Sequence, residues 1–335
     1  MRAAVLREYG VPLDLSSVPD PVLADGEALL RVGAVGLCAT DLKLLSGGLS
    51  HLAALPVIPG HEVCGRVVHG GGPGLDGRRA ACYLYESCGR CRLCLVGHPT
   101  ACRAAVRIGT ERDGGLATYL AVQRRNLIPV ADHVSDEQAA VAMDAVAAPW
   151  SALHRQATIG PDSLVLIVGA GGLGIHAVQI ARMRRARVAV VDVSSSRRER
   201  ALKLGAELAL DPADAGRLRE WSEGGFDLAL ECSGRREGFE VAADALRPGG
   251  RVVCNGYAPG VEYGVDSMRL VLDEIEIVGS RLGTFESSRA ALGAVERGDV
   301  VPEIGMVVGF DDVNDAFGAL AEGSVDGRIV VRVGP

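Results

Sequence analysis

The chain has 335 residues, of which 48% are hydrophobic and 23% charged, and its formal net charge is −7. At roughly 150 residues per domain this length predicts two domains with buried cores, and the acidic balance argues against nucleic acid as a partner. The sequence contains no uninterrupted run of about 18 apolar residues, so we expect no transmembrane helix. The first residues lack the apolar core of a secretory signal peptide, so we expect a cytoplasmic location. In that compartment the nine cysteines favour metal or thiol chemistry over disulfides.

The first part of the chain reads as short strands separated by Gly and Pro, which is typical of a small β-rich domain. We expect strands at residues 1–6, 27–34, 63–68 and 79–84, followed by one helical stretch over 139–155. From residue 163 strands and helices alternate, which predicts a parallel sheet covered by helices on both faces. Here we expect strands at 164–168, 187–191, 227–231 and 251–255, with helices at 173–183, 197–204 and 237–246.

The last part leaves this alternation, with helices expected near 287–297 and 311–322 and a strand at 328–333. We therefore expect it to return to the first domain. The predicted fold class is α/β, with a β-rich domain at 1–145, a parallel-sheet domain at 146–281 and a returning segment at 282–335.

Four cysteines lie close together in the β-rich part, at Cys88, Cys91, Cys94 and Cys102. This spacing suits a tetrahedral zinc ion bound by four thiolates. Such a site has no open position, so we expect it to stabilise the lobe at 88–102 without taking part in chemistry. An iron–sulfur cluster is an alternative for the same four ligands, and a nucleic-acid-binding zinc ribbon is another.

A second set of metal ligands is spread along the chain, at Cys38, His61 and Asp144. Each of them alone has a simpler structural explanation, but together they supply a thiolate, an imidazole and a carboxylate. Three protein ligands plus water is the arrangement of a catalytic zinc, which can polarise an alcohol or carbonyl oxygen. We expect Asp41 to orient His61, and Glu62 to contact the metal or its neighbours.

A glycine-rich loop follows the strand at 164–168 and opens a helix, with the sequence Gly169-Ala170-Gly171-Gly172-Leu173-Gly174. In this context the glycines let backbone N–H groups meet the pyrophosphate of a dinucleotide. Asp192 ends the next strand and would accept a hydrogen bond from a ribose 2′-hydroxyl, which favours NAD over NADP. Arg197 lies nearby, and its positive charge leaves NADP as an alternative cofactor. The glycine-rich loop by itself has another interpretation, a methyltransferase-type nucleotide fold.

Together these motifs resemble the zinc-dependent medium-chain alcohol dehydrogenases. The resemblance covers nearly the whole chain and rests on the segments GLCATD, PGHE, the four-cysteine lobe, MDAVAAPWSAL and GAGGLG, in that order. It implies a GroES-like catalytic domain made from both ends of the chain, a Rossmann domain between them, and a homodimer or homotetramer. It looks like the branch in which Asp is the third ligand of the catalytic zinc, similar to bacterial secondary-alcohol dehydrogenases.

The resemblance also implies individual roles. Thr40 would hydrogen-bond the substrate oxygen, Arg328 would contact the pyrophosphate, and the backbone ending at Gly256 would meet the nicotinamide amide. Lys43 stands where some members have a relay histidine, and Arg281 lies in a loop that usually borders the substrate. Two cations there would suit a polar, anionic or polyhydroxylated alcohol. The expected activity is hydride transfer between a secondary or polyol alcohol and NAD; a zinc-independent reductase and a non-catalytic zinc- and NAD-binding regulator are the alternatives.

Overall fold

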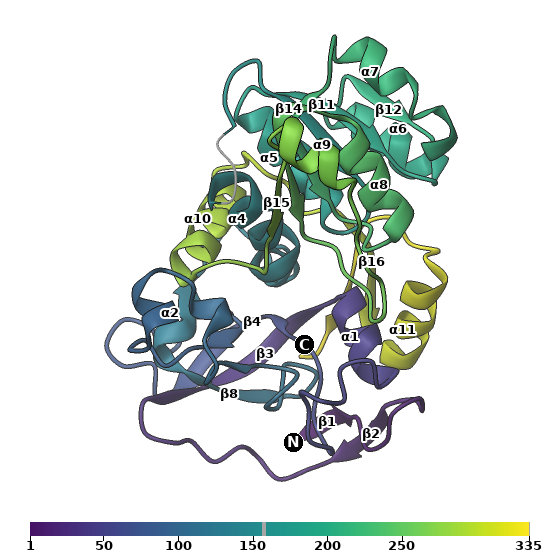
Figure 1. Cartoon of the computed structure of the whole chain (residues 1–335). Helices are drawn as coiled ribbons and strands as arrows, with labels where there is room; N and C mark the ends of the chain where they lie inside the picture. Colours follow the sequence, from purple (N-terminus) through teal and green to yellow (C-terminus); the bar gives the residue numbers. More distant parts are fainter. Residues whose placement is uncertain (156–158, 335) are drawn as a thin grey trace. The chain divides into compact units, whose positions relative to one another are not determined.

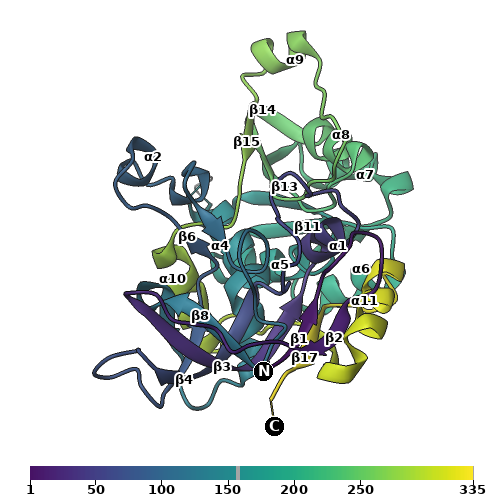
Figure 2. The same ribbon diagram turned by 90° about the horizontal axis from the view of Figure 1, so that it is seen from below.

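The computed structural model describes residues 1–155 and 159–334, which form two compact units. Unit 1 consists of Met1–Asp144, Thr284–Arg297 and Ile304–Pro335, and unit 2 of Ala145–Gly283 and Gly298–Glu303. The N-terminal and C-terminal segments therefore both belong to unit 1, as the chain ends marked in Figure 2 illustrate. The returning segment is interrupted, because its residues 298–303 belong to unit 2.

Unit 1 contains a mixed sheet of seven strands: β3 (Glu27–Leu37), β4 (Glu62–His69), β5 (Arg79–Cys82), β8 (Tyr119–Gln123), β9 (Leu127–Pro129), β16 (Ile304–Gly309) and β17 (Arg328–Arg332). Strand β3 is the centre of this sheet, because it pairs antiparallel with β4, β8 and β17. One hydrophobic core is built on these strands. It includes side chains that are 0% exposed: Leu30, Val35, Val63 and Ile329. The pairing of β3 with β17 brings the C-terminal strand next to the segment that leads into Cys38.

The remaining strands of unit 1 form two short antiparallel pairs, β1 (Arg2–Val5) with β2 (Asp14–Ser17) and β6 (Tyr85–Glu86) with β7 (Val106–Arg107). Its α-helices are α1 (Ala39–Leu45), α2 (Arg92–Leu95), α3 (Asp136–Val141), α10 (Phe285–Glu296) and α11 (Val313–Glu322). Single 3₁₀ turns lie at Pro99–Ala101, Arg124–Asn126 and Phe310–Asp312.

The segment 139–155 is helical, as predicted, but it is not one regular helix. Helix α3 ends at Val141, a π-helical turn follows at Ala142–Val146, and α4 (Ala147–Arg155) continues in unit 2. A π turn carries one more residue per hydrogen-bonded turn than an α-helix, so the faces before and after it are out of phase. Asp144 lies inside this turn.

Unit 2 is a six-stranded parallel sheet with the order β12-β11-β10-β13-β14-β15. Figure 1 labels four of these strands, β11, β12, β14 and β15. Its strands are β10 (Leu164–Val168), β11 (Arg187–Val191), β12 (Leu208–Leu210), β13 (Phe226–Glu231), β14 (Leu246–Cys254) and β15 (Glu276–Gly279). Its further helices are α5 (Gly174–Met183), α6 (Ser195–Lys203), α7 (Arg217–Trp221), α8 (Arg236–Asp244) and α9 (Ser267–Leu272), and a 3₁₀ turn lies at Pro212–Asp214.

The strand order of unit 2 reverses beside β10. From β10 the chain first moves outward through β11 to β12, and then returns to β13 on the other side of β10. Right-handed crossovers in opposite directions place helices on both faces of the sheet, as predicted. Ligands of such sheets bind beyond the carboxyl ends of the strands at the reversal.

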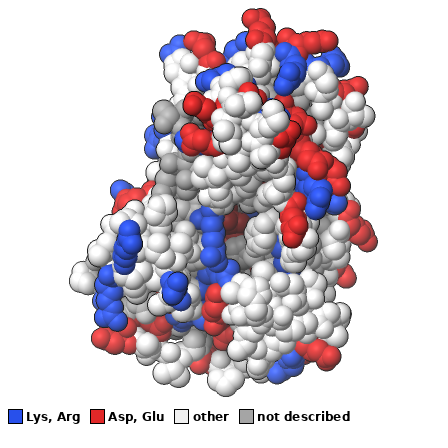
Figure 3. Space-filling view, in the orientation of Figure 1, with Lys and Arg blue, Asp and Glu red and all other residues white. Residues whose placement is uncertain are grey.

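The surface carries both signs of charge. Figure 3 shows Lys and Arg side chains interspersed with Asp and Glu on the face in view. Among the described residues, none of the helices combines the length and apolar character that crossing a membrane requires.

Candidate functional site

Four potential metal ligands from distant parts of the chain meet in unit 1. The ligand atoms of Cys38, His61, Glu62 and Asp144 all lie within 4.8 Å of one another. Cys38 Sγ is 3.4 Å from Asp144 Oδ2, and His61 Nε2 is 3.7 Å from the same oxygen. Ligands at 2.0–2.3 Å from a tetrahedral zinc are separated by roughly 3.3–3.8 Å, so these distances fit a bound zinc ion.

Asp41 orients two members of this cluster. Cys38 is the N-cap of α1, and its Sγ accepts the backbone N–H of Thr40. Asp41, which is 1% exposed, accepts the Cys38 N–H on Oδ2 and lies 3.0 Å from His61 Nδ1 with Oδ1. With Nδ1–H donating to Asp41, the lone pair of His61 is on Nε2, the atom that faces Asp144.

Arg328 on β17 completes the cluster as a buried cation. Its Nη2 is 2.7 Å from Glu62 Oε1, 3.1 Å from Asp144 Oδ2 and 3.6 Å from Cys38 Sγ. The contact with Glu62 is an ion pair outside hydrogen-bond geometry, and both oxygens of Glu62 are buried without a hydrogen-bond partner among the described residues. Buried carboxylate oxygens that accept no hydrogen bond can still interact with a neighbouring cation, so these two oxygens fit a metal ion bound at the cluster.

Charges control the protonation of these groups. Burial raises the pKa of the Glu62 carboxyl well above its usual value, despite the Arg328 guanidinium. Burial is also the largest influence on Cys38 and opposes its ionisation, but Arg328 and His61 together outweigh it and lower the pKa of that thiol. For Asp144, burial is outweighed by His61 and Arg328, which hold the pKa of the carboxyl well below its usual range. Burial alone would lower the pKa of His61, but Asp41 and Asp144 raise it well above its usual value, so a metal would displace a proton there.

The four-cysteine lobe has the geometry predicted for a closed zinc site. Sulfur–sulfur distances around Cys88, Cys91, Cys94 and Cys102 are 3.6, 3.6, 3.7 and 3.9 Å. Four thiolates bound to zinc at 2.3 Å lie roughly 3.8 Å apart, so the donor set fits the ion. Gly89 has φ +69° within this loop, a conformation that favours glycine.

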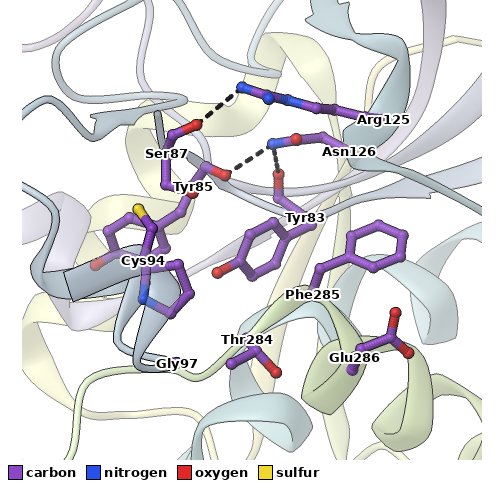
Figure 4. Close-up of a pocket in the computed structure, with 11 residues that line it drawn as sticks. Tyr83, Tyr85, Ser87, Cys94, Gly97, Arg125, Asn126, Thr284, Phe285 and Glu286 are labelled. Atoms are coloured by element: carbon purple, nitrogen blue, oxygen red, sulfur yellow. Dashed lines mark hydrogen bonds between the residues drawn. The ribbon is translucent and has the colours of Figure 1, made fainter. Parts of the chain in front are cut away.

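A pocket of about 310 Å³ lies beside the lobe, between it and the start of α10 (Figure 4). Its walls include the rings of Tyr83, Tyr85 and Phe285, and Tyr83 packs edge-on against Phe285. Asn126 Nδ2 donates to the backbone oxygens of Tyr83 and Tyr85, as the dashed lines in Figure 4 show. Cys94 is the only potential ligand of either cluster among its lining residues, so this pocket belongs to the lobe and not to the Cys38 cluster.

In unit 2 the glycine-rich loop joins β10 to α5, as the sequence predicts. A Cβ on Gly174 would lie 1.9 Å from the backbone oxygen of Gly169, and Gly169 has φ +88°, so neither position tolerates a side chain. His176 Nδ1 is 2.8 Å from the Gly172 oxygen, and its Nε2 accepts the backbone N–H of Glu303. This cradle of bare backbone at the N-terminus of a ten-residue helix fits the pyrophosphate of a dinucleotide.

The other predicted cofactor residues surround that loop. Asp192 follows β11 and accepts the N–H groups of Ala170 and Ser194 over 2.6 and 2.8 Å. The guanidinium of Arg197 approaches Gly171, since a Cβ there would lie 3.8 Å from its Nη1. Gly256 follows β14, and its N–H donates to the Glu231 backbone oxygen. Leu173 is the N-cap of α5 and makes no side-chain capping bond.

The remaining predicted residues belong to both units. Thr40 and Lys43 are half-buried on α1 in unit 1, and burial lowers the pKa of Lys43 although Cys38 and Asp144 oppose this. Arg281 is exposed in unit 2. Arg328, expected at the pyrophosphate, has its guanidinium in the Cys38 cluster of unit 1. Sequence reasoning missed this association; its only signal is an arginine within the apolar strand Arg328–Arg332.

Comparison with known proteins gives the same family for both parts of the chain. Residues 24–132 match the alcohol dehydrogenase GroES-like domain, and residues 172–297 match the zinc-binding dehydrogenase family. An alcohol dehydrogenase of Geobacillus stearothermophilus is 34% identical over 99% of this chain and 100% of its own length. An L-threonine 3-dehydrogenase of Streptomyces avermitilis is also 34% identical, over 99% of each chain.

A solved structure agrees in fold. The crystal structure of the alcohol dehydrogenase from the archaeon Aeropyrum pernix has a TM-score of 0.92 and 28% sequence identity, covering 99% of this chain and 100% of that one. The predicted architecture, a GroES-like domain with a Rossmann-type parallel-sheet domain, is thereby confirmed. From these likenesses over nearly its whole length, the chain belongs to the zinc-dependent medium-chain alcohol dehydrogenases and is an oxidoreductase that interconverts alcohols and carbonyl compounds with a nicotinamide cofactor.

Proposed function

We propose that the chain oxidises a secondary alcohol with NAD at a zinc ion bound by Cys38, His61 and Asp144, in the branch of the family with an Asp ligand. The observation that carries this proposal is the convergence of these three ligands beside Asp41. A second zinc ion, bound by the four cysteines of the lobe, has a structural role. Thiolate ligands persist in a reducing compartment, and we place the protein in the cytoplasm.

Each of the two units has its own role in the proposed reaction. Unit 1 is the catalytic domain, in which zinc supplies a Lewis acid for the substrate oxygen. Unit 2 binds NAD, which accepts the hydride. Thr40 Oγ1 would accept the proton of the substrate hydroxyl as its own hydroxyl hydrogen passes to water, and Asp41 holds the tautomer of His61. Lys43 lies on the same helix as Thr40 and adds a positive charge near this path. Glu62 lies beside Arg328 and would adjoin the zinc without being a permanent ligand.

The preference for NAD rests on Asp192. Its carboxylate lies where the ribose 2′-hydroxyl of the adenosine is expected, and it would repel a 2′-phosphate. Arg197 lies over the loop at Gly171 and is suited to the pyrophosphate.

The substrate class rests on the relatives and on Lys43. The substrate named for the Streptomyces relative, L-threonine, carries a secondary hydroxyl at its third carbon. Lys43 adds a cation near the Cys38 cluster, which suits a polar or polyhydroxylated secondary alcohol. Arg281 is a second candidate for an anionic substituent. If substituting Lys43 or Arg281 by Ala leaves the ratio of kcat/KM for charged and neutral alcohols unchanged, that residue has no role in selecting charge.

We infer that the protein is a homodimer or a homotetramer, assembled through the outer edge of unit 2. Strand β15 is the last strand of its sheet, and Ile277 on it is 42% exposed. On α9 the exposed fractions of Met268, Val271 and Leu272 are 67%, 69% and 72%. An open strand edge beside apolar side chains is self-complementary about a twofold axis. Light scattering should therefore give a multimer for the wild type and a smaller species for Val271→Glu.

The experiment that tests the proposed activity is a screen for NADH formation over primary, secondary and polyol alcohols. Turnover of secondary alcohols, lost with a chelator and restored by zinc, is the expected result. Turnover that survives complete zinc removal would instead indicate a zinc-independent reductase. Cofactor binding without turnover of any alcohol or carbonyl compound would indicate a regulator.

A further inference from the structure

A buried histidine links the glycine-rich loop of unit 2 to a distant segment of the same unit. His176 is the third residue of α5 and is 0% exposed. Its Nδ1 donates to the Gly172 oxygen over 2.8 Å, and its Nε2 accepts the backbone N–H of Glu303 over 2.8 Å. A carbonyl oxygen can only accept and an N–H can only donate, so these two bonds place the ring hydrogen on Nδ1. Two backbone groups together therefore select one tautomer of this imidazole.

The bond from the ring to Gly172 takes the place of a backbone bond of the helix. In a regular α-helix the Gly172 oxygen would accept the N–H four residues later, which is that of His176. Here the His176 N–H donates to the Leu173 oxygen over 3.1 Å instead. The imidazole therefore satisfies a carbonyl that the first turn of α5 leaves free.

This bond also sets the direction of a neighbouring donor. The peptide between Gly172 and Leu173 is trans, and in a trans peptide the C=O and the following N–H point in opposite directions. Because the Gly172 oxygen is held toward His176, the Leu173 N–H points away from the ring. Within the residues that the structure describes, this N–H has no hydrogen-bond acceptor. It is a donor available to an anion at the start of α5.

The other side of the ring is fixed by a connecting segment, Gly298–Glu303, which joins α10 to β16 and belongs to unit 2 although both of these elements belong to unit 1. Gln179, on the next turn of α5, holds this segment with two bonds. Its Nε2 donates to the Val301 oxygen over 2.9 Å, and its Oε1 accepts the Val301 N–H over 2.8 Å. Arg200 of α6 donates from Nε to Glu303 Oε2 over 2.6 Å. The Glu303 N–H is therefore a donor on an anchored segment.

We propose that His176 is a positioning residue for the pyrophosphate of the bound dinucleotide. It holds the peptide between Gly172 and Leu173 so that the Leu173 N–H is presented to a phosphate oxygen, and the imidazole itself does not touch the phosphate. The Glu303 N–H belongs to this arrangement, because it keeps the ring hydrogen on Nδ1. A donor that is oriented before the ligand arrives lowers the entropy lost on binding. This inference rests on the proposed binding of NAD by unit 2, and it adds a side chain and a segment outside the glycine-rich loop to that site.

Two substitutions separate the two bonds of the ring. The amide nitrogen of asparagine is attached to Cγ, as Nδ1 of histidine is, so His176→Asn keeps the donor to the Gly172 oxygen and loses the acceptor for Glu303. The amide oxygen of glutamine reaches the position of Nε2, so His176→Gln keeps that acceptor and loses the donor. Calorimetry measures the affinity for ADP-ribose, which carries the pyrophosphate, and the melting temperature measures stability. Neither measurement needs turnover.

The two variants should change different quantities. We expect His176→Gln to bind ADP-ribose about fivefold more weakly, because the contribution of one hydrogen bond is lost, and to melt close to the wild type. His176→Asn should bind ADP-ribose within about twofold of the wild type. It should melt lower by about 2 °C or more, because the buried N–H of Glu303 loses its acceptor. Adenosine, which lacks both phosphates and is measured by displacement of NADH, should bind all three proteins alike.

Gln179→Leu is the matched control. Its substitution removes two bonds between the same helix and the same connecting segment, and both of these bonds are to Val301. We expect a lower melting temperature with an unchanged affinity for ADP-ribose. His176→Met, which also lacks the donor, replaces His176→Gln if the latter does not fold.

The outcomes are distinct. Wild-type protein that binds neither NADH nor ADP-ribose would refute the proposed cofactor site and this inference with it. If the wild type binds ADP-ribose and His176→Gln binds it equally well, this inference alone is refuted. It is also refuted if the affinity falls as much in His176→Asn as in His176→Gln, because the ring would then act only through the stability of unit 2.

Discussion

Asp41 Oδ1 lies 3.0 Å from His61 Nδ1, while Asp41 Oδ2 accepts the backbone N–H of Cys38 over 2.9 Å. One buried carboxylate therefore fixes two of the three proposed zinc ligands, one by its side chain and the other by its backbone. Residues that orient metal ligands typically change metal affinity by about 10–100-fold when they are replaced.

We accordingly expect Asp41→Asn to weaken the catalytic zinc by about 10–100-fold and to lower kcat/KM at limiting zinc. Competition with a chromophoric chelator measures this affinity separately from that of the lobe. Asp20→Asn is the control, because the Asp20 side chain is 65% exposed and pairs with the N-terminal ammonium, away from the Cys38 cluster. Equal zinc affinity in the Asp41 variant and the control would show that Asp41 does not orient the ligands.

Replacing one lobe cysteine should remove one zinc ion and destabilise unit 1 locally. In Cys94→Ser we expect the zinc content to fall from about two to about one per chain, with a melting temperature lower by about 5 °C or more. Metal analysis and calorimetry measure the two effects. Cys254→Ser, which changes a cysteine outside both clusters, should keep the full zinc content. A full zinc content in Cys94→Ser as well would mean that the lobe does not bind the ion through four thiolates.

Asp192 should control the choice between NAD and NADP. Asp192→Ser removes the negative charge, so we expect kcat/KM for NAD to fall by about tenfold or more and the NAD-to-NADP ratio to move toward one. Asp244→Asn is a control, because Asp244 is an 81% exposed carboxylate of unit 2 at the end of α8 that pairs with Arg269. If the ratio stays at its wild-type value in Asp192→Ser, the preference has another origin.

His154 predicts a specific loss of stability in acid. Its Nδ1–H donates to the Trp150 oxygen and its Nε2 accepts from Arg184, so the folded protein holds a neutral imidazole. Burial and the Arg184 charge lower the pKa of His154 from 6.5 to about 4. Between these values the unfolded chain binds the additional proton, so the stabilising contribution is full above pH 6.5 and is lost as the pH falls toward 4.

The melting temperature measured from pH 7 to pH 4.5 checks this prediction. His154→Gln should start lower and fall less steeply than the wild type. His51→Gln, which alters an exposed imidazole, should keep the wild-type slope. Parallel curves for the wild type and His154→Gln would contradict the assignment.

The alternating part of the fold could be predicted because its strands are short apolar runs bounded by glycine and polar residues. β10 and β11 begin and end where the sequence predicts, at Leu164–Val168 and Arg187–Val191. Strand β16 was not predicted, because Ile304–Gly309 has glycine at two positions and alternates between half-buried and exposed side chains. The π turn at Ala142–Val146 was missed for a different reason, since apolar periodicity shows that a segment is helical but not where an extra residue is inserted.

For the site, the sequence identifies ligand types but not their distances. Cys38 and Asp144 are 106 positions apart, and only the folded structure brings Sγ and Oδ2 within 3.4 Å. The Gly-x-Gly-x-x-Gly loop could be located because its spacing is a local property. The association of Arg328 with Glu62 could not, because the two residues are 266 positions apart on strands β17 and β4, which are neighbours only through β3, and this leaves no local pattern.

Anomalous diffraction at the zinc edge, from crystals of zinc-loaded protein, tests the central claim most directly. The account predicts two peaks per chain, one among the four lobe cysteines and one bound by Cys38 Sγ, His61 Nε2 and Asp144. A single peak at the lobe in metal-replete crystals, with those three side chains holding no ion, would contradict it.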